Sequence, residues 1–231
     1  PTIENNIGLT VDGEGLGIFE SIIEGLEART DYYLRAYATN EKGTAYGSVL
    51  NFTTDDPPWQ CGDLLNYNGQ EYSTIIIGEQ CWIGENLNVG IRINGNQFMS
   101  NNQVTEKYCY NNDETNCEIY GGLYQWNEMM QYITIEGSQG ICPDGWHIPT
   151  DNEWSELVDF IGSPSNAGGK MKEEGFEHWN EPNTGATNLS GFTALPGGGN
   201  EPNGLSFYYI GTRAHFMSST LSTPSTSSWT R

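Results

Sequence analysis

A helix that begins at Asp151 is the feature of this sequence that most constrains its fold. Thr150 and Glu153 have the S/T-x-x-E spacing of a capping box, in which two residues satisfy each other's backbone N–H groups at a helix start. Gly162 is the residue expected just after the last turn. Four apolar residues in between fall at i, i+3, i+4 and i+7, which places them on one helical face: Trp154, Leu157, Val158 and Ile161. We therefore predict a helix that buries this face.

Shorter elements are predicted on both sides of this helix. Asn68-Gly69 is a hairpin-turn signal, and Gly78-Glu79 is the turn between two further strands. A helix is predicted over 120–132, with Leu123, Trp126 and Met130 on one face. Residues 94–106 are polar and are expected to form a loop. The remaining predictions are a short helix at 167–173 and strands at 71–77, 80–83, 107–110, 146–148, 191–195, 207–211 and 216–220.

Residues 1–54 have the pattern of a β domain. Strands are predicted at 18–23, 31–38 and 45–53. The stretch LEARTDYY at 26–33 resembles the tyrosine corner of β-sandwiches, in which a tyrosine hydroxyl bonds back to upstream backbone. Together with RAYATNEKGTAYG and NFTT, it resembles the second half of a fibronectin type III domain, a partial immunoglobulin-like sandwich. The early strands of that fold are missing, so we expect a truncation here. A small β-hairpin unit unrelated to that family is the alternative.

A linker is predicted over 55–60, because Pro57 and Pro58 cannot continue a strand ladder. A second domain is therefore expected over 61–231, starting near Trp59 or Cys61.

The formal charge of −21 argues against a nucleic-acid partner, because phosphate binding needs a positive surface. The same charge disfavours anionic membrane surfaces. No run of apolar residues approaches the 18 or so that a membrane-spanning helix needs, and no signal peptide is recognisable. We expect no membrane insertion of this segment.

Several long motifs in the second domain occur in a known order. They are IGEQCWIGENLN, CYNNDE, YGGLYQWNEMM, CPDGWHIPTDNEW, HWNEPNTGATNLSGFTALPGG and MSST. From about Cys61 to Arg231 the chain thereby resembles the Fibrobacter succinogenes major paralogous domain, a family of bacterial secreted and surface proteins. The family is similar to C-type-lectin-like and formylglycine-generating-enzyme-like folds. The resemblance implies an α+β domain with two helices on a small twisted antiparallel sheet and long loops. Family members continue to a last cysteine-containing strand, so a truncation is also expected at the C-terminus.

The five cysteines are an odd number, which suggests a free thiol or a partner elsewhere. Cys109 and Cys117 flank a short polar loop, and we predict a local disulfide between them; two buried thiols are the alternative. The pairing of Cys61, Cys81 and Cys142 cannot be read from the sequence. Formylglycine-generating enzymes use active-site cysteines late in the domain, and no cysteine follows Cys142 here. Their activity is therefore not expected.

Three groups of residues could suggest a metal site, and each has a simpler interpretation. Residues 111–116 carry closely spaced oxygen ligands but lack the glycine and terminal glutamate of a calcium loop, so a solvated acidic loop is preferred. The tripeptide EPN at 181–183 and 201–203 also occurs in calcium-binding lectins, but turns explain both copies. His147, His178 and His215 are isolated, and a packed, hydrogen-bonded role is expected for His147. No cofactor or metal is predicted; calcium stays an alternative.

The last segment, from Phe207, is rich in tyrosine, serine, threonine, arginine and histidine, which is typical of ligand-contacting loops. Some lectin-like domains of the family resemble the variable proteins of diversity-generating retroelements, which vary this region. Phe207, Phe216 and Met217 are expected to point inward. A Ser/Thr-rich loop without a ligand is the alternative. The side chains predicted to share one exposed ligand-binding face are Tyr208, Tyr209, Thr212, Arg213, His215 and Trp229.

These observations predict a non-catalytic recognition or adhesion module of a secreted or cell-surface bacterial protein, with a glycan or a cell-surface protein as its ligand. A structural or assembly module without its own ligand is the alternative. An enzyme of the formylglycine-generating type is a third, disfavoured hypothesis.

Overall fold

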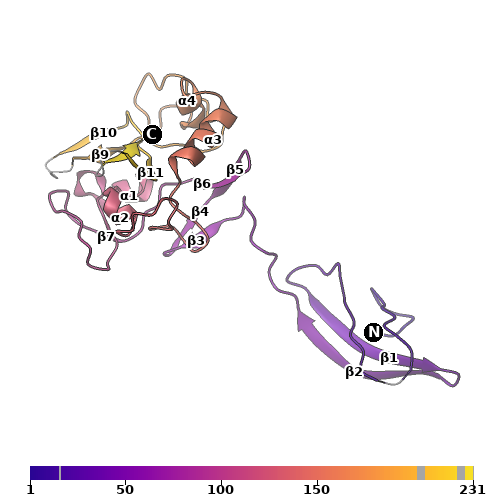
Figure 1. Cartoon of the computed structure of the whole chain (residues 1–231). Coiled ribbons are helices and arrows are strands. Elements are labelled where there is room, and N and C mark those ends of the chain that lie inside the picture. The colour runs from indigo at the N-terminus through magenta and orange to yellow at the C-terminus, as the bar shows by residue number, and fades with distance from the viewer. Residues whose placement is uncertain (16, 202–205, 223–226, 231) are drawn as a thin grey trace. The chain divides into compact units, whose positions relative to one another are not determined.

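The computed structural model describes residues 1–231 except 16, 202–205, 223–226 and 231 (Figure 1). The chain divides into two compact units, Pro1–Gln60 and Cys61–Arg231. No helix in the described part of the chain is long and apolar enough to cross a membrane.

The first unit is organised around one antiparallel hairpin. Strand β1 (Asp31–Asn40) pairs with β2 (Gly43–Thr53), and the register runs from Asp31 opposite Thr53 to Asn40 opposite Gly43. The Tyr32 hydroxyl accepts a hydrogen bond of 2.8 Å from the backbone N–H of Glu27, which is the contact expected of a tyrosine corner.

The predicted strand at 18–23 is wrong. This segment has no strand structure, and Ile18 and Ile22 are exposed. A strand needs a neighbour to satisfy its backbone groups. In the described residues of this unit, the only sheet is the β1–β2 pair, so the apolar run finds no ladder to join.

The second unit is a mixed α+β structure of short strands and few helices, which confirms the predicted class. Its strands are β3 (Leu65–Tyr67), β4 (Gln70–Tyr72), β5 (Thr74–Ile77), β6 (Gln80–Ile83), β7 (Ile91–Arg92), β8 (Glu106–Lys107), β9 (Gly197–Asn200), β10 (Phe207–Ile210), β11 (Met217–Ser222) and β12 (Ser227–Thr230). Its helices are the 3₁₀ turn η1 (Tyr110–Asn112), α1 (Glu114–Tyr120), α2 (Trp126–Met129), α3 (Asp151–Ile161) and α4 (Ala167–Met171).

The strands of this unit pair two by two rather than in one sheet. In the described residues the pairs are β3–β4, β5–β6, β9–β10 and β11–β12, all antiparallel, and the parallel pair β7–β8. The hairpin β3–β4 turns at Asn68-Gly69, as predicted. The predicted strand 71–77 is broken at Ser73, because the N–H of Ser73 donates to the Glu85 carboxylate at 2.7 Å.

Helix α3 forms as predicted. Thr150 Oγ1 accepts from the N–H of Glu153 at 3.2 Å, and the Glu153 carboxylate accepts from the N–H of Thr150 at 2.7 Å. Gly162 follows the helix with φ 156°. Trp154 and Leu157 are buried, while Val158 and Ile161 pack at the edge of the core.

The described residues of the second unit form two apolar core clusters. In the first, Trp154 and Leu157 of α3 meet the β5–β6 hairpin; its buried members are Ile77, Trp82, Trp154, Leu157, Met171, Phe192 and Ala194. The second contains Val89, Met129, Met130, Ile141, Cys142 and Ile148. Full burial of a side chain such as Leu157 contributes roughly 1.5–3 kcal/mol.

The predicted helix over 120–132 is wrong over most of its length. The sequence YGGLYQWNEMM instead contains the end of α1, a non-helical connection that begins at Gly121-Gly122, and the four-residue α2. Gly121 adopts φ 79°, and a Cβ there would lie 2.4 Å from that of Asn86, so the chain turns closely against its neighbour. Leu123 then exchanges two backbone hydrogen bonds with Tyr108, both 2.9 Å long.

Two predicted strands are also absent. Residues 146–148 form no strand, because the N–H of Trp146 closes a turn with Pro143 O and that of Ile148 bonds to Ser138 O. Over 191–195 there is only an isolated bridge between Ala194 and Lys172. The strand predicted at 107–110 is shorter, because β8 ends at Lys107 and η1 begins at Tyr110. The short helix at 167–173 and the strands at 80–83, 207–211 and 216–220 correspond to α4, β6, β10 and β11.

Candidate ligand-binding site

Four of the predicted ligand-binding side chains lie together on β10 and the loop after it. The guanidinium of Arg213 lies 4.0 Å from the ring centroid of Tyr209. The ring of Tyr208 contacts those of Tyr209, with centroids 5.1 Å apart, and His215, at 6.1 Å. Tyr209, Arg213 and His215 are exposed, and Tyr208 is half-buried. We call these four residues the tyrosine–arginine surface.

Glycines in β9 leave room for the ring of Tyr208, which lies opposite Gly199 in the β9–β10 pair. A Cβ at Gly199 would meet the Tyr208 ring at 2.8 Å. Gly198 adopts φ 64°, and a Cβ there would lie 2.3 Å from the Tyr208 carbonyl oxygen. A side chain at Gly199 would therefore displace the ring, and one at Gly198 would collide with the backbone of β10, which explains both glycines.

The turn after β10 is held by backbone hydrogen bonds. Tyr209 O accepts from the N–H groups of Thr212 and Arg213, and Gly198 N–H donates to Arg213 O at 3.0 Å. Gly211 N–H donates to Pro196 O, and its own carbonyl accepts from Asn180 N–H at 2.7 Å. These contacts fix the positions from which the exposed side chains project.

The other predicted residues are placed as follows. Thr212 is exposed and donates its hydroxyl to Tyr209 O at 3.0 Å. The backbone of Trp229 lies in β12, and its side chain is outside what the structure describes. Phe216 points inward as predicted, because its ring packs on Trp154 and Phe192 with centroids 5.4 Å apart in each case. Phe207 packs on Tyr110, and Met217 borders the second core cluster.

The charge state of the tyrosine–arginine surface depends on His215. Desolvation by its neighbours lowers the pKa of His215 below its ordinary value of 6.5, and the positive charge of Arg213 lowers it further. At neutral pH the surface therefore combines one permanent cation with neutral rings.

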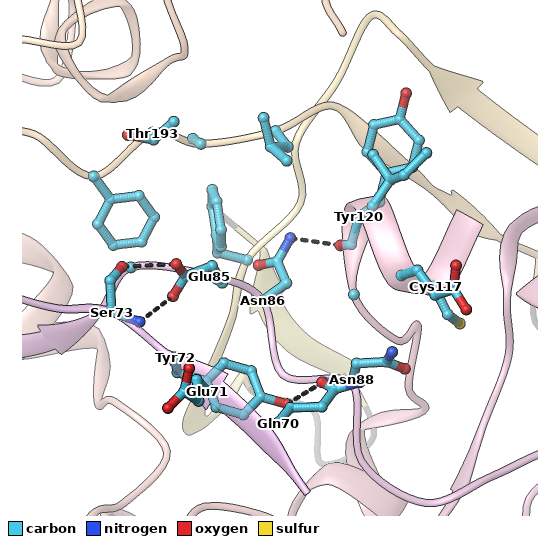
Figure 2. Close-up of a pocket in the computed structure, with 18 of the residues that line it drawn as sticks. Gln70, Glu71, Tyr72, Ser73, Glu85, Asn86, Asn88, Cys117, Tyr120 and Thr193 are labelled. Carbon is cyan, nitrogen blue, oxygen red and sulfur yellow. Dashed lines mark hydrogen bonds between the residues drawn. The ribbon is translucent and has the colours of Figure 1, made fainter. Parts of the chain in front are cut away.

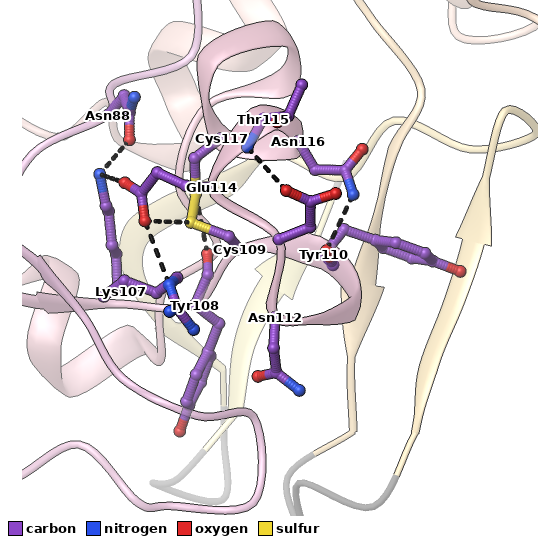
Figure 3. Close-up of a disulfide and its surroundings, with 12 residues drawn as sticks. Asn88, Lys107, Tyr108, Cys109, Tyr110, Asn112, Glu114, Thr115, Asn116 and Cys117 are labelled. Carbon is purple, nitrogen blue, oxygen red and sulfur yellow. Dashed lines mark hydrogen bonds and ion pairs between the residues drawn. A yellow bond between two sulfur atoms is a disulfide. The ribbon is translucent and has the colours of Figure 1, made fainter.

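A disulfide joins Cys109 and Cys117 (Figure 3). The predicted bond is confirmed, with a Cα–Cα distance of 5.1 Å. Cys109 directly precedes η1, and the ring of Tyr110 in η1 lies 5.2 Å from that of Phe207 in β10. The predicted solvated loop at 111–116 is wrong in part: Asp113 accepts from Thr115 N–H and begins α1.

A buried lysine stands beside this disulfide. Lys107 is buried, and its ammonium pairs with the Glu114 carboxylate at 3.1 Å and donates to the side chain of Asn88 (Figure 3). Glu114 also pairs with Arg92 at 3.1 Å. A buried charge is tolerated when it is paired and hydrogen-bonded in this way.

The other cysteines have distinct roles. Cys61 and Cys81 form a second disulfide with a Cα–Cα distance of 5.9 Å, a pairing that the sequence left open. Cys142 is free and buried. Burial raises the pKa of its thiol to about 12, which suppresses the reactive thiolate.

A cavity of about 490 Å³ is the second candidate site (Figure 2). Part of its polar lining is hydrogen-bonded within the protein: Glu85 accepts from Ser73 N–H and Oγ, and Asn86 Nδ2 donates to Tyr120 O at 2.9 Å. Among the lining residues that the structure describes, none is a histidine, a lysine or a free thiol. The residues that line it are 70–73, 84–86, Asn88, 117–121, 191–195 and Phe216.

One cluster of possible metal ligands escaped the sequence analysis. Glu173, Glu177 and His178 place one ligand atom each within 4.8 Å of one another. The sequence treated His178 as isolated, which is wrong; the signal was the spacing E-x-x-x-E-H. The turn predicted at 181–183 is confirmed, since the backbone N–H of Asn183 donates to Asn180 O at 3.2 Å. Pro202 and Asn203 of the second EPN copy lie outside the described residues.

His147 is hydrogen-bonded, as expected: its Nε2 lies 2.8 Å from the Glu153 carboxylate at the start of α3.

Comparison with known proteins gives one finding. Neither the curated proteins nor the solved structures contain a match to this chain. The model of the Fibrobacter succinogenes major domain matches residues 75–230. Because that match covers more than half of the chain, the protein belongs to the Fibrobacter succinogenes major domain family.

Proposed function

We propose that this chain is a non-catalytic recognition or adhesion module of a bacterial secreted or cell-surface protein, and that it binds a glycan or a protein ligand. The observation that carries the proposal is the tyrosine–arginine surface. The guanidinium of Arg213 stacks on the ring of Tyr209 at 4.0 Å, and the ring of Tyr208 packs edge-on against that of Tyr209. Side chains held in place before binding lose less conformational entropy when a ligand arrives. Tyrosine and arginine are also enriched among the residues that dominate binding energy.

The cysteines support an extracellular or cell-surface location. The pairs Cys61–Cys81 and Cys109–Cys117 are bonded, and disulfides persist mainly in oxidising compartments. The formal charge of −21 further disfavours nucleic acid as the ligand.

The state of Cys142 supports a non-catalytic function. A formylglycine-generating activity needs reactive thiols, whereas this thiol is buried and its pKa is raised to about 12. The other four cysteines are held in disulfides.

For the fold, we propose a C-type-lectin-like arrangement of the second unit and a fibronectin type III-like sandwich for the first. The Tyr32–Glu27 hydrogen bond supports the latter. So do the exposed side chains of Leu34, Leu50 and Phe52, which share one face of the hairpin, as a face that meets a second sheet would require. Replacing Tyr32 with Phe should then cost about 0.5–1.5 kcal/mol. The matched change Tyr33→Phe, at a residue 64% exposed, should cost little. Equal effects of the two changes would count against the tyrosine corner. An experimental structure of the full chain would test the lectin-like arrangement.

Binding assays with the full chain test the proposed function. The chain is applied to a glycan array and, separately, used to recover proteins from a bacterial surface fraction. Saturable binding to a defined glycan or protein supports recognition. A structural or assembly module without its own ligand predicts no saturable binding in either assay, and that result would overturn the proposal.

A further inference from the structure

We propose that Glu173, Glu177 and His178 form a binding site for one divalent transition-metal ion of the zinc type. Their ligand atoms lie within 4.8 Å of one another, in a loop between α4 and β9. Two carboxylates and one imidazole are a donor set that such ions use, with a further coordination position left to solvent or to a bound group.

The carboxylate of Glu173 gives a second, independent observation. Its Oε1 lies 2.8 Å from His178 Nδ1. Its Oε2 is fully buried, and it has no hydrogen-bond partner. A buried carboxylate oxygen without a partner is costly. A cation held by this carboxylate would compensate that cost.

The loop is built to hold Glu173 and His178 in place. Asn183 Nδ2 donates to the carbonyls of Glu173 and Gly175, at 2.9 and 2.8 Å. The His178 ring meets the Tyr120 ring edge-on, with centroids 5.8 Å apart. The side chains of Glu173 and His178 are 15% and 24% exposed, so the surrounding structure limits their movement.

Metal binding at this cluster requires only small movements of the side chains. In a tetrahedral zinc site with bonds of about 2.0–2.1 Å, neighbouring ligand atoms lie about 3.4 Å apart. The ligand atoms lie within 4.8 Å of one another, so pairs farther apart than about 3.4 Å must approach. Glu173 Oε1 and His178 Nδ1, which lie 2.8 Å apart, must separate slightly if both bind the ion. Glu177 is exposed, so rotation about its side-chain bonds can bring its carboxylate closer.

The donor chemistry selects the kind of ion. Calcium and magnesium take oxygen ligands, whereas imidazole nitrogen suits zinc and its neighbours in the transition series. The formal charge of −21 raises the concentration of cations near the protein. The site also lies near the tyrosine–arginine surface, because Asn180, two residues after His178, donates to Gly211 O at 2.7 Å.

The test is calorimetric titration of the metal-free full chain with zinc chloride. We expect one site per chain whose affinity falls at least tenfold in Glu177→Gln and in His178→Gln, since even the loss of an outer partner of a metal ligand costs about 10–100-fold. The matched control is His147→Gln. His147 also lies 2.8 Å from a glutamate, Glu153, but among the described residues it belongs to no three-ligand cluster. Calcium chloride should bind this site far more weakly than zinc.

Three outcomes would overturn the site. Zinc affinity could stay unchanged in Glu177→Gln and His178→Gln, it could fall equally in His147→Gln, or calcium could match zinc. Thermal unfolding without metal shows whether each variant is folded. If His178→Gln is not folded, the zinc affinity of Glu177→Gln alone decides the test. Glu177 is exposed, so its side chain can be changed without disturbing the core.

Discussion

The indole rings of Trp154 and Trp82 lie with their centroids 4.7 Å apart, and this contact joins α3 to the β5–β6 hairpin. Trp154 also contacts Phe192 and Phe216, so one side chain connects four segments that are distant in sequence. Its indole N–H donates to Met217 O at 3.3 Å. The first core cluster is therefore centred on this tryptophan.

Replacing Trp154 with alanine should lower the free energy of unfolding by about 3–5 kcal/mol, because it leaves a cavity among aromatic rings. The measurement is urea unfolding followed by circular dichroism. Phe160→Ala is the matched control on the same helix, at a residue 68% exposed, and should cost far less. Similar losses in both variants would show that α3 is packed differently.

The capping box should make stability depend on pH. Burial by itself would raise the pKa of Glu153, but hydrogen bonds from Thr150 and His147 outweigh it and hold this pKa below the ordinary value of 4.5. A carboxylate with a lowered folded-state pKa stabilises the protein above the unfolded pKa, and this stabilisation is lost as the pH falls through the folded one. Glu153→Gln should therefore be less stable than the parent chain near pH 6, and the difference should shrink below about pH 4.5.

Urea unfolding of both proteins at a series of pH values measures this difference. Asp159→Asn, an exposed change on the same helix, is the control and should leave the pH dependence nearly as in the parent chain. Thr150→Ala should independently cost about 1 kcal/mol through loss of the cap. A stability difference for Glu153→Gln that is constant between pH 3 and pH 6 would contradict the predicted linkage.

Elements with complete local signals could be predicted from the sequence. The capping box, apolar face and terminal glycine of α3 lie within 13 residues of each other and are independent of the rest of the fold. The turn at Asn68-Gly69 is likewise a local signal. Helix α1 was not predicted because its first residues, Glu114-Thr115-Asn116, are all polar. Its start depends on Asp113 as N-cap, and its position depends on the Cys109–Cys117 bond.

Other predictions failed because they depend on whether distant segments of the chain contact each other. The apolar run at 18–23 has the composition of a strand, yet it has no partner strand in the described residues. The site shows the same division. Tyr208, Tyr209, Arg213 and His215 are close in sequence and could be grouped by composition, whereas the orphaned oxygen of Glu173 is visible only in the folded loop.

Cys142 should be the cysteine that resists modification in the folded protein. Mass spectrometry without reductant should find the pairs Cys61–Cys81 and Cys109–Cys117. Iodoacetamide at pH 8 should label Cys142 only after unfolding, because the thiol is buried and its pKa is raised to about 12. Rapid labelling of the folded chain at this residue would contradict both the burial and the raised pKa.

Opening the Cys109–Cys117 bond should destabilise the chain. The double change to serine should cost roughly 2–3 kcal/mol by chain-entropy estimates for a short loop. Urea unfolding measures the cost. Because the ring of Tyr110, the residue after Cys109, packs on Phe207 of β10, the same variant should also bind the ligand more weakly. A double variant as stable as the parent chain would show that the bond does not constrain this loop.

Arg213 should control the protonation of His215. Desolvation and the charge of Arg213 both lower the pKa of His215, so Arg213→Gln should raise this pKa toward 6.5 without restoring it completely. NMR titration of the imidazole resonances measures the shift. Arg92→Gln is the control, because Arg92 pairs with Glu114 and is not among the charges that act on His215. An unchanged titration in Arg213→Gln would show that the charge of Arg213 does not act on His215.

The tyrosine–arginine surface should bind as a coupled pair. Once a ligand is identified, Tyr209→Ala and Arg213→Ala should each weaken its binding and leave the thermal midpoint nearly unchanged, because both side chains are exposed. Because the guanidinium stacks on the ring at 4.0 Å, either change also removes part of the other residue's preorganisation. The double variant should therefore lose less binding energy than the sum of the two single losses.

The matched control for this cycle is Phe160→Ala, which removes an exposed aromatic ring from α3. It should bind the ligand as the parent chain does. Isothermal titration calorimetry gives the affinities, and differential scanning calorimetry gives the midpoints. Unchanged binding in both single variants would place the ligand elsewhere on the protein. Loss of fold together with binding would favour a structural module, because the surface would then be part of the packing rather than a site that is free to contact a ligand.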